Sequence, residues 1–269
     1  SEIKPFIARL ASRHYARLVE RHLIKVPATE SPDAPALSLP TTTTPWEVGD
    51  DVRSIDWLAS VLNAGEMAGA MPLRREMIPD DSPRADGEIP NIEIYLDTSG
   101  SMPDPQRRTN AMSLAAQILA TATTRQGGRV RGIIYSSGPP HCSDWIANEA
   151  QACAFFMNYS GGGTDYPFKH LNGSCKKWPG ALRVILSDQD FLYNIQQEGS
   201  RGAFEQALDQ CPMIVCMLHL HYNSKQAKAR LDTAFGSLQG HPSLRLLHIQ
   251  DLTGFASAAS ALSRALFDD

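Results

Sequence analysis

The ten residues Ile92–Ser101, with the sequence IEIYLDTSGS, join a short apolar run to a group of carboxyl and hydroxyl side chains. The run Ile92–Leu96 predicts a strand, because it is short, largely apolar and bounded by polar residues. The sequence Asp97-Thr-Ser-Gly-Ser that follows predicts a tight loop, since Gly100 leaves the backbone free to turn. In open α/β sheets, ligands bind beyond the carboxyl ends of the strands, so functional residues are expected in such loops.

Apolar runs continue to alternate with helical patterns from this stretch to the end of the chain. Further strands are expected at Val130–Ser136, Leu182–Leu186, Met213–Leu220 and Leu244–Ile249, with a weaker one near His141–Ile146. Helices are expected over residues 107–125, 148–158, 197–210, 224–235 and 254–267. Apolar strands that alternate with amphipathic helices are typical of a mostly parallel sheet covered on both faces. Residues 91–269 are therefore predicted to form an α/β domain with a doubly wound, Rossmann-like sheet.

Residues 1–90 differ in character and are predicted to form an N-terminal extension. A helix is expected over residues 5–25, then a proline-rich linker or extended segment over 27–45. Short strands are expected within 46–90, with Val52–Trp57 and Leu73–Ile78 as the candidates. Basic residues recur every four positions along the helix, at Arg9, Arg13, Arg17, Arg21 and Lys25. Such a stripe is most often a solvated face, and the alternative is a docking surface for an acidic partner.

The composition is that of a globular protein and argues against several functional classes. Of the 269 residues, 42% are hydrophobic and 20% are charged, and the formal net charge is −4, which does not suggest a dedicated nucleic-acid binder. No apolar run approaches the roughly 20 residues that a membrane-spanning helix needs, and the first residues do not resemble a signal peptide. The five cysteines lack CxxC spacing, which favours a reducing compartment. The expected location is the cytoplasm.

Three oxygen-rich segments fall in loops of the predicted fold. Asp97–Ser101 follows the first strand, Ser187–Asp190 (SDQD) follows Leu182–Leu186, and Ser160–Asp165 (SGGGTD) lies in a loop that leads into a helix. Carboxylates and hydroxyls are hard oxygen donors, which suit Mg²⁺ or Mn²⁺ and not zinc. A site with few bound carboxylates leaves the cation under-neutralised, so it gains from an anionic oxygen supplied by another protein or by a phosphate.

The pattern Asp97-x-Ser99-x-Ser101, with Thr164 and Asp188 in later loops, resembles the metal-ion-dependent adhesion site of von Willebrand factor A domains. The resemblance implies that Ser99 and Ser101 bind the metal directly, and Thr164 directly or through water. It also implies that Asp97 and Asp188 hold the waters and the serine hydroxyls, while a partner's Asp or Glu fills the open position. Mg²⁺ is the expected ion, with Mn²⁺ or Ca²⁺ as alternatives. Gln189 stands where the family often has glycine, and the secondary candidate ligands are Asp190 and Asp165.

A second stretch, Trp46–Trp57 (WEVGDDVRSIDW) followed by Arg74-Arg75-Glu76, resembles the segment that precedes the A domain in a family of bacterial proteins. Those proteins are typically encoded beside MoxR-type AAA+ ATPases, and many are anchored in a membrane. The resemblance implies a non-enzymatic adaptor that works with such an ATPase to assemble, remodel or activate a client protein. A local ion-pair network is the structural alternative for the charged residues of Gly49–Trp57.

The same oxygen cluster leaves an enzymatic alternative, a Mg²⁺-dependent phosphohydrolase. The sequence offers no identifiable nucleophile, general base or Lys/Arg clamp for such an enzyme. Arg107 and Arg108 are the nearby cations, and both are expected in the first turn of a helix. A binding protein is therefore favoured over an enzyme, and a structural subunit whose metal site stays empty is the third alternative.

Overall fold

The chain forms two compact units. The computed structural model describes residues 3–23, 40–45, 73–77, 90–221 and 224–267. The larger unit comprises residues 1–27 and 87–268, and the smaller one comprises residues 28–86 with residue 269. The expected limits of the two domains, 1–90 and 91–269, stay a prediction.

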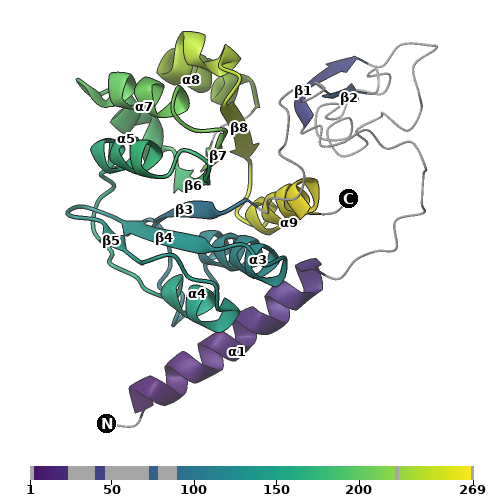
Figure 1. Ribbon diagram of the computed structural model, residues 1–269, viewed down its shortest axis with the longest axis vertical. Coiled ribbons are helices and arrows are strands. Elements are labelled where there is room, and N and C mark those ends of the chain that lie inside the picture. Colours follow the sequence, from purple (N-terminus) through teal and green to yellow (C-terminus); the bar gives the residue numbers. More distant parts are fainter. Residues whose placement is uncertain (1–2, 24–39, 46–72, 78–89, 222–223, 268–269) are drawn as a thin grey trace. The chain divides into compact units, whose positions relative to one another are not determined.

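A six-stranded sheet forms the centre of the larger unit (Figure 1). Its spatial order is β5-β4-β3-β6-β7-β8, and every neighbouring pair is parallel except β4 and β5. The strands are β3 (Ile92–Asp97), β4 (Val130–Tyr135), β5 (His141–Cys142), β6 (Leu182–Asp188), β7 (Ile214–His219) and β8 (Leu244–Ile249). The chain runs from β3 outward to β4 and β5, then returns to place β6 on the other side of β3. The predicted doubly wound, mostly parallel sheet is thus confirmed, and its strand order reverses between β3 and β6.

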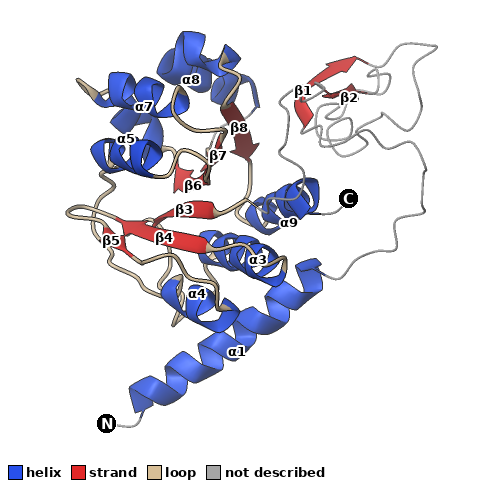
Figure 2. Ribbon diagram, viewed as in Figure 1, coloured by secondary structure: helices blue, strands red, loops and turns tan. Residues whose placement is uncertain are grey.

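Helices cover both faces of this sheet (Figures 1 and 2). One face carries α3 (Ala111–Arg125), α4 (Glu149–Phe155) and α9 (Gly254–Phe267), and α1 (Ile3–Leu23) packs on α3 and α9. The other face carries α5 (Phe168–Lys177), α6 (Asp190–Ile195), α7 (Ser200–Leu208), α8 (Ser224–Phe235) and the 3₁₀ helix η2 (Gly236–Gly240). Because both faces are covered, the side chains that point to either face of β3, β6 and β7 are buried. This burial explains why these strands read as continuous apolar runs.

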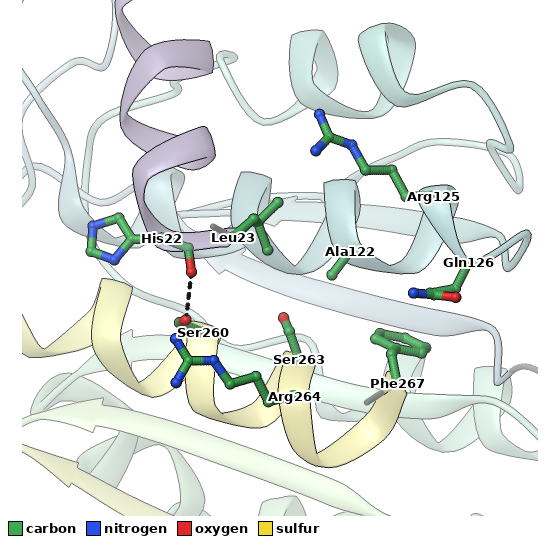
Figure 3. A pocket seen from close by; sticks show the side chains of 9 residues that line it. All are labelled: His22, Leu23, Ala122, Arg125, Gln126, Ser260, Ser263, Arg264 and Phe267. Carbon is green, nitrogen blue, oxygen red and sulfur yellow. Dashed lines mark hydrogen bonds between the residues drawn. The ribbon is translucent and has the colours of Figure 1, made fainter. Parts of the chain in front are cut away.

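The N-terminal helix α1 is held to the larger unit by side chains on one of its faces. Tyr15 and Val19 are buried there, and the Tyr15 hydroxyl accepts a hydrogen bond of 2.7 Å from the Asn110 backbone N–H. At the C-terminal end of α1, the Ser260 hydroxyl of α9 donates to the His22 carbonyl at 2.8 Å (Figure 3). The helix begins at Ile3 and ends at Leu23, so it starts and stops two residues before its expected bounds, and Lys25 lies outside the described residues.

The described part of the smaller unit is a two-stranded sheet. β1 (Pro40–Pro45) pairs antiparallel with β2 (Leu73–Met77), which confirms the short strand expected at Leu73–Ile78 apart from its last residue. A strand at Pro40–Pro45 was not predicted. It forms because each strand of a two-stranded sheet has a free edge, where proline's missing N–H costs little, and because threonine favours extended backbone. The expected strand Val52–Trp57 and the stretch Trp46–Trp57 lie outside the described residues.

Two helical predictions need correction. α3 begins at Ala111 rather than at residue 107, because Asn110 caps it by accepting a 3.0 Å hydrogen bond from the Ser113 N–H. Arg107 and Arg108 therefore lie in a turn, where both of their N–H groups bond to the Asp104 carbonyl, and not in a helix. The helix α5 was expected only as an unbounded helix after the Ser160–Asp165 loop, and α6 was not predicted. α5 is only ten residues long and contains Gly173, and α6 is shorter still, so their helical periodicity is brief.

Candidate metal centre

The ends of β3 and β6 lie side by side and bring the first two oxygen-rich segments together. Asp97, the last residue of β3, is buried, and its Oδ1 accepts a 2.9 Å hydrogen bond from the Ser99 N–H. Its Oδ2 accepts a 2.7 Å hydrogen bond from the Ser187 hydroxyl, which comes from β6. One carboxylate therefore fixes both the loop after β3 and the end of the neighbouring strand.

A chain of hydrogen bonds links the two serines of the first segment to Asp188. The Ser101 hydroxyl donates to Asp188 Oδ2 at 2.7 Å, and the Ser99 and Ser101 hydroxyl oxygens are 3.0 Å apart. Because Ser101 gives its only proton to Asp188, Ser99 is the donor in the bond between the serines. Asp188 Oδ1 in turn accepts a 2.9 Å hydrogen bond from the Asp190 N–H. Ser99 is buried and Ser101 is exposed, so the chain runs from the interior to the surface.

A glycine loop carries Thr164 against this cluster. The Gly161 N–H donates to the Thr98 carbonyl at 2.9 Å, and the Gly100 N–H donates to the Gly162 carbonyl at 2.7 Å. Gly162 has a φ of +91°, and a Cβ there would come within 2.7 Å of the Ser137 hydroxyl oxygen. Both observations call for glycine at this position. The third oxygen-rich segment is thus joined to the first by backbone hydrogen bonds in both directions.

The Thr164 hydroxyl is not satisfied by a hydrogen bond of good geometry among the described residues. Its oxygen is buried, and the Thr164 carbonyl accepts a 3.1 Å bond from the Asn194 amide. Among those residues, its one polar neighbour of note is Asp190, where the contact with the Thr164 hydroxyl counteracts part of the rise in the carboxyl's pKa. A buried hydroxyl without a hydrogen bond is unfavourable by about 1–3 kcal/mol, and an ion or a water bound beside it would remove this cost.

The cluster carries negative charge that no ion pair offsets within the described part of the chain. Burial raises the pKa of the Asp97 carboxyl to about 6, against the opposing hydrogen bonds from Ser99 and Ser187, and the charge of Asp188 adds to the rise. Burial and the charge of Asp188 also raise the pKa of Asp190. Within the described ranges, Asp97, Asp188 and Asp190 form no ion pair with a lysine, arginine or histidine. The site therefore favours an added cation.

The donor set decides which cation would fit. Among the residues that the structure describes, no three His, Cys, Asp or Glu side chains lie close enough to hold a metal by themselves. Serine and threonine hydroxyls must then supply part of the coordination, together with water. A hard divalent ion such as Mg²⁺ accepts such ligands and keeps several waters, whereas zinc prefers His and Cys.

Not every candidate residue joins the cluster. Asp165 is exposed, and its backbone N–H bonds to the Ser136 carbonyl at 3.0 Å, away from the serine chain. The expected docking residues Arg9, Arg13, Arg17 and Arg21 are exposed on α1. A cavity of about 210 Å³ also lies elsewhere, between the C-terminal ends of α1, α3 and α9 (Figure 3). None of the candidate metal ligands lines it.

Three supporting residues were assigned no role from the sequence, although Ser187 stands in one of the oxygen-rich segments. Ser187 holds Asp97, the Tyr159 hydroxyl donates to the Met102 carbonyl at 2.9 Å, and Asn194 bonds the chain on either side of Asp165. Ser187 directly precedes Asp188, so its position after an apolar run was a usable signal. Asn194 lies in the unpredicted helix α6, and Tyr159 belongs to no recognisable motif. The sequence around these two residues therefore gave no signal of their roles.

Comparison with known proteins identifies no family for this chain by sequence, since no family model and no curated protein matches it. Solved structures that it resembles include a von Willebrand factor type A protein from Catenulispora acidiphila, BatB from Bacteroides thetaiotaomicron and an aerotolerance-related membrane protein from Bacteroides fragilis. The respective identities are 13%, 13% and 12%, and the TM-scores are 0.43, 0.45 and 0.42. The matches cover 66%, 65% and 65% of this chain, and 43%, 96% and 98% of those chains. This chain thus spans less than half of the Catenulispora protein, and its fold is assigned from its own strand order.

In the described ranges, none of the helices combines the length and the apolar character that crossing a membrane would require.

Proposed function

We propose that residues 91–269 form a von Willebrand factor A domain that binds Mg²⁺ at Asp97, Ser99, Ser101, Thr164 and Asp188. Through this ion the domain binds an Asp or Glu of a partner protein. The observation that carries the proposal is the buried, unsatisfied Thr164 hydroxyl beside Asp190, in a group of carboxylates without an ion-pair partner among the described residues. The exposed Ser101 leaves the cluster open to an incoming side chain.

The protein's own hydrogen bonds orient the oxygen donors. Ser101 directs its proton to Asp188, and Ser99 directs its proton to Ser101, so lone pairs of both hydroxyls stay available. Asp97 accepts hydrogen bonds from Ser99 and Ser187 and so fixes the loop that carries the serine ligands. When bound, Mg²⁺ would supply a site that accepts a carboxylate oxygen. The backbone bonds between the two loops keep Thr164 in reach of the same point.

We propose binding rather than catalysis as the role of this site. Arg107, a candidate clamp for phosphate, is exposed and pairs with Asp104 at 3.5 Å. Within the described residues, no lysine or arginine forms an ion pair with the carboxylates of the cluster. A phosphohydrolase would need such a cation, or a general base, beside the bound ester. We therefore propose a cytoplasmic adaptor that works with a MoxR-type AAA+ ATPase on a client protein.

The test is capture of a purified MoxR-type ATPase from the protein's source organism by the tagged protein, in Mg²⁺ and in EDTA. We expect capture in Mg²⁺ and its loss in EDTA and in the double variant Ser99→Ala/Ser101→Ala. The matched control is Thr233→Ala/Ser237→Ala, which removes two exposed hydroxyls on α8 and η2 and should leave capture unchanged. Undiminished capture by the Ser99/Ser101 variant would contradict the proposed site. Turnover of phosphate esters in Mg²⁺, lost in the same variant, would favour the enzymatic alternative instead.

A further inference from the structure

Helix α1 turns one face to the domain and the opposite face to solvent. Tyr15 and Val19 are buried against the domain, whereas Arg9, Arg13, Arg17 and Arg21 are exposed. We call these four residues the α1 arginine row. Residues four apart on a helix lie about 6 Å apart along its axis and about 40° apart around it. The row is therefore about 18 Å long and winds slowly over the side opposite Tyr15 and Val19.

The α1 arginine row forms no stabilising pairs within the described part of the chain. None of its members forms an ion pair or hydrogen bond with another described residue. Like charges four residues apart destabilise a helix by a few tenths of a kcal/mol per pair. The only acid in Ile3–Leu23 is Glu20, and it is paired with Arg125 of α3. Among the described residues, no ion pair offsets this repulsion within the row.

The charge of α1 contrasts with that of the whole chain. Ile3–Leu23 contains five lysines and arginines and one acid, a net charge of +4, in a chain whose net charge is −4. Positive charge is therefore concentrated on this helix, where it would attract an acidic surface. Arginine also suits this role because its planar guanidinium can bind a carboxylate through two hydrogen bonds.

One exposed apolar side chain accompanies the row and indicates the kind of partner. Leu10 is 50% exposed and lies about 60° around the helix from Arg13. Ile7 is 43% exposed, but it lies about 160° around the helix from Arg9 and so is not part of this face. Leu10 stands between Arg9 and Arg13 in sequence and on the solvent side of the helix. Phosphate backbones offer charge but no apolar surface, whereas an amphipathic acidic helix of a protein offers both.

We propose that the α1 arginine row, with Leu10, docks an acidic helix of a partner protein. The partner helix would carry Asp or Glu at four-residue spacing to meet the guanidinium groups, with an apolar side chain facing Leu10. The contact uses no metal and lies on a different element from the candidate metal centre. It therefore goes beyond the proposed function and does not depend on it.

The test uses a synthetic helical peptide with Glu at every fourth position and leucines on the same face. A second peptide has the same composition in scrambled order. Binding to the full chain is measured by fluorescence anisotropy at 150 mM salt, with EDTA present throughout. We expect the ordered peptide to bind at least tenfold more tightly than the scrambled one. We also expect at least a tenfold loss in Arg13→Glu/Arg17→Glu and a smaller loss in Leu10→Ser.

The matched control is Lys225→Glu/Lys228→Glu, which makes the same charge reversal on the exposed side of α8. Unchanged binding by this control supports a specific surface on α1, provided circular dichroism shows that all variants are folded. Equal binding of the two peptides, or equal loss in both charge reversals, would overturn the proposal. So would α1-dependent binding of duplex RNA or anionic vesicles that exceeds binding of the ordered peptide. Failure here, with Mg²⁺-dependent capture intact, would leave the metal site standing.

Discussion

Each end of β3 buries a carboxylate, but only the one at the start of the strand has cationic partners among the described residues. At the start of the strand, Glu93 is fully buried and receives Arg131 from β4, which pairs with its Oε1. Arg183 from β6 reaches its Oε2 at 3.4 Å, and the Tyr95 hydroxyl donates to the same oxygen at 3.1 Å. At the end of the strand, Asp97 is equally buried, and its partners among the described residues are the neutral donors Ser99 and Ser187.

The difference separates a structural charge cluster from a binding site. Around Glu93, the two guanidiniums also bond to backbone carbonyls, Arg131 to Ser143 and Arg183 to Ser174 and Trp178. Each oxygen of the Glu93 carboxylate thus has a guanidinium partner, and the backbone carbonyls accept the remaining guanidinium N–H groups. Around Asp97 and Asp188 the negative charge has no counter-charge among the described residues, although burial of an unpaired charge is expensive. A demand for a cation therefore exists at only one end of the strand, where strand order reverses.

Removing the carboxylate at the satisfied end should have the largest effect on stability. Glu93→Gln leaves Arg131 and Arg183 buried without their counter-charge, so we expect a loss of about 3–5 kcal/mol in the free energy of unfolding. Urea denaturation followed by circular dichroism measures it. Glu205→Gln, which changes an exposed glutamate on α7, should stay within about 0.5 kcal/mol. A Glu93→Gln variant as stable as this control would remove the contrast between the two ends.

The unsatisfied end should respond to pH in the metal-free protein. The folded-state pKa of Asp97 is about 6, against an ordinary value of 3.8. Between these two pH values, the folded state keeps a proton on Asp97 that the unfolded state releases. Stability from this group therefore rises as the pH falls from about 7 to about 4, by up to about 3 kcal/mol. Burial lowers the pKa of His170, His219 and His248, which acts in the opposite direction at acid pH.

The measurement that isolates Asp97 is the difference between wild type and Asp97→Asn. Melting temperatures of both proteins are recorded in EDTA from pH 4 to pH 7.5. We expect wild type to gain stability relative to Asp97→Asn as the pH falls through 6, since the histidine contributions cancel in the difference. A constant difference over this range would show that Asp97 is not a strained carboxylate. In Mg²⁺, stabilisation of the wild type should weaken as the pH falls through the same range, because protons compete for Asp97.

What could be predicted from sequence depended on how local the signal was. The strands β3 and β6 and the segments at their ends follow from apolar runs and adjacent polar residues, and their meeting follows from the topology of parallel sheets. The cluster around Glu93 was missed, because Arg131 and Arg183 lie 38 and 90 residues away and only the folded sheet brings them together. Glu93 itself was concealed within an apolar run. The unsatisfied hydroxyl of Thr164 is likewise visible only in the structure.

The smallest expected effect sharpens the interpretation of Thr164. Thr164→Val keeps the shape of the side chain and removes a hydroxyl that has no hydrogen bond of good geometry among the described residues. In EDTA, loss of an unsatisfied buried group should leave stability unchanged or raise it by up to about 1 kcal/mol. In Mg²⁺ the variant should instead be less stable than wild type, because it lacks one oxygen ligand for the metal. The rise in melting temperature on adding Mg²⁺ should therefore be smaller than in wild type. Thr164→Ser, which retains the oxygen, should restore that rise. A Thr164→Val variant that gains as much from Mg²⁺ as wild type would remove Thr164 from the ligands and leave its unsatisfied hydroxyl as a purely structural cost.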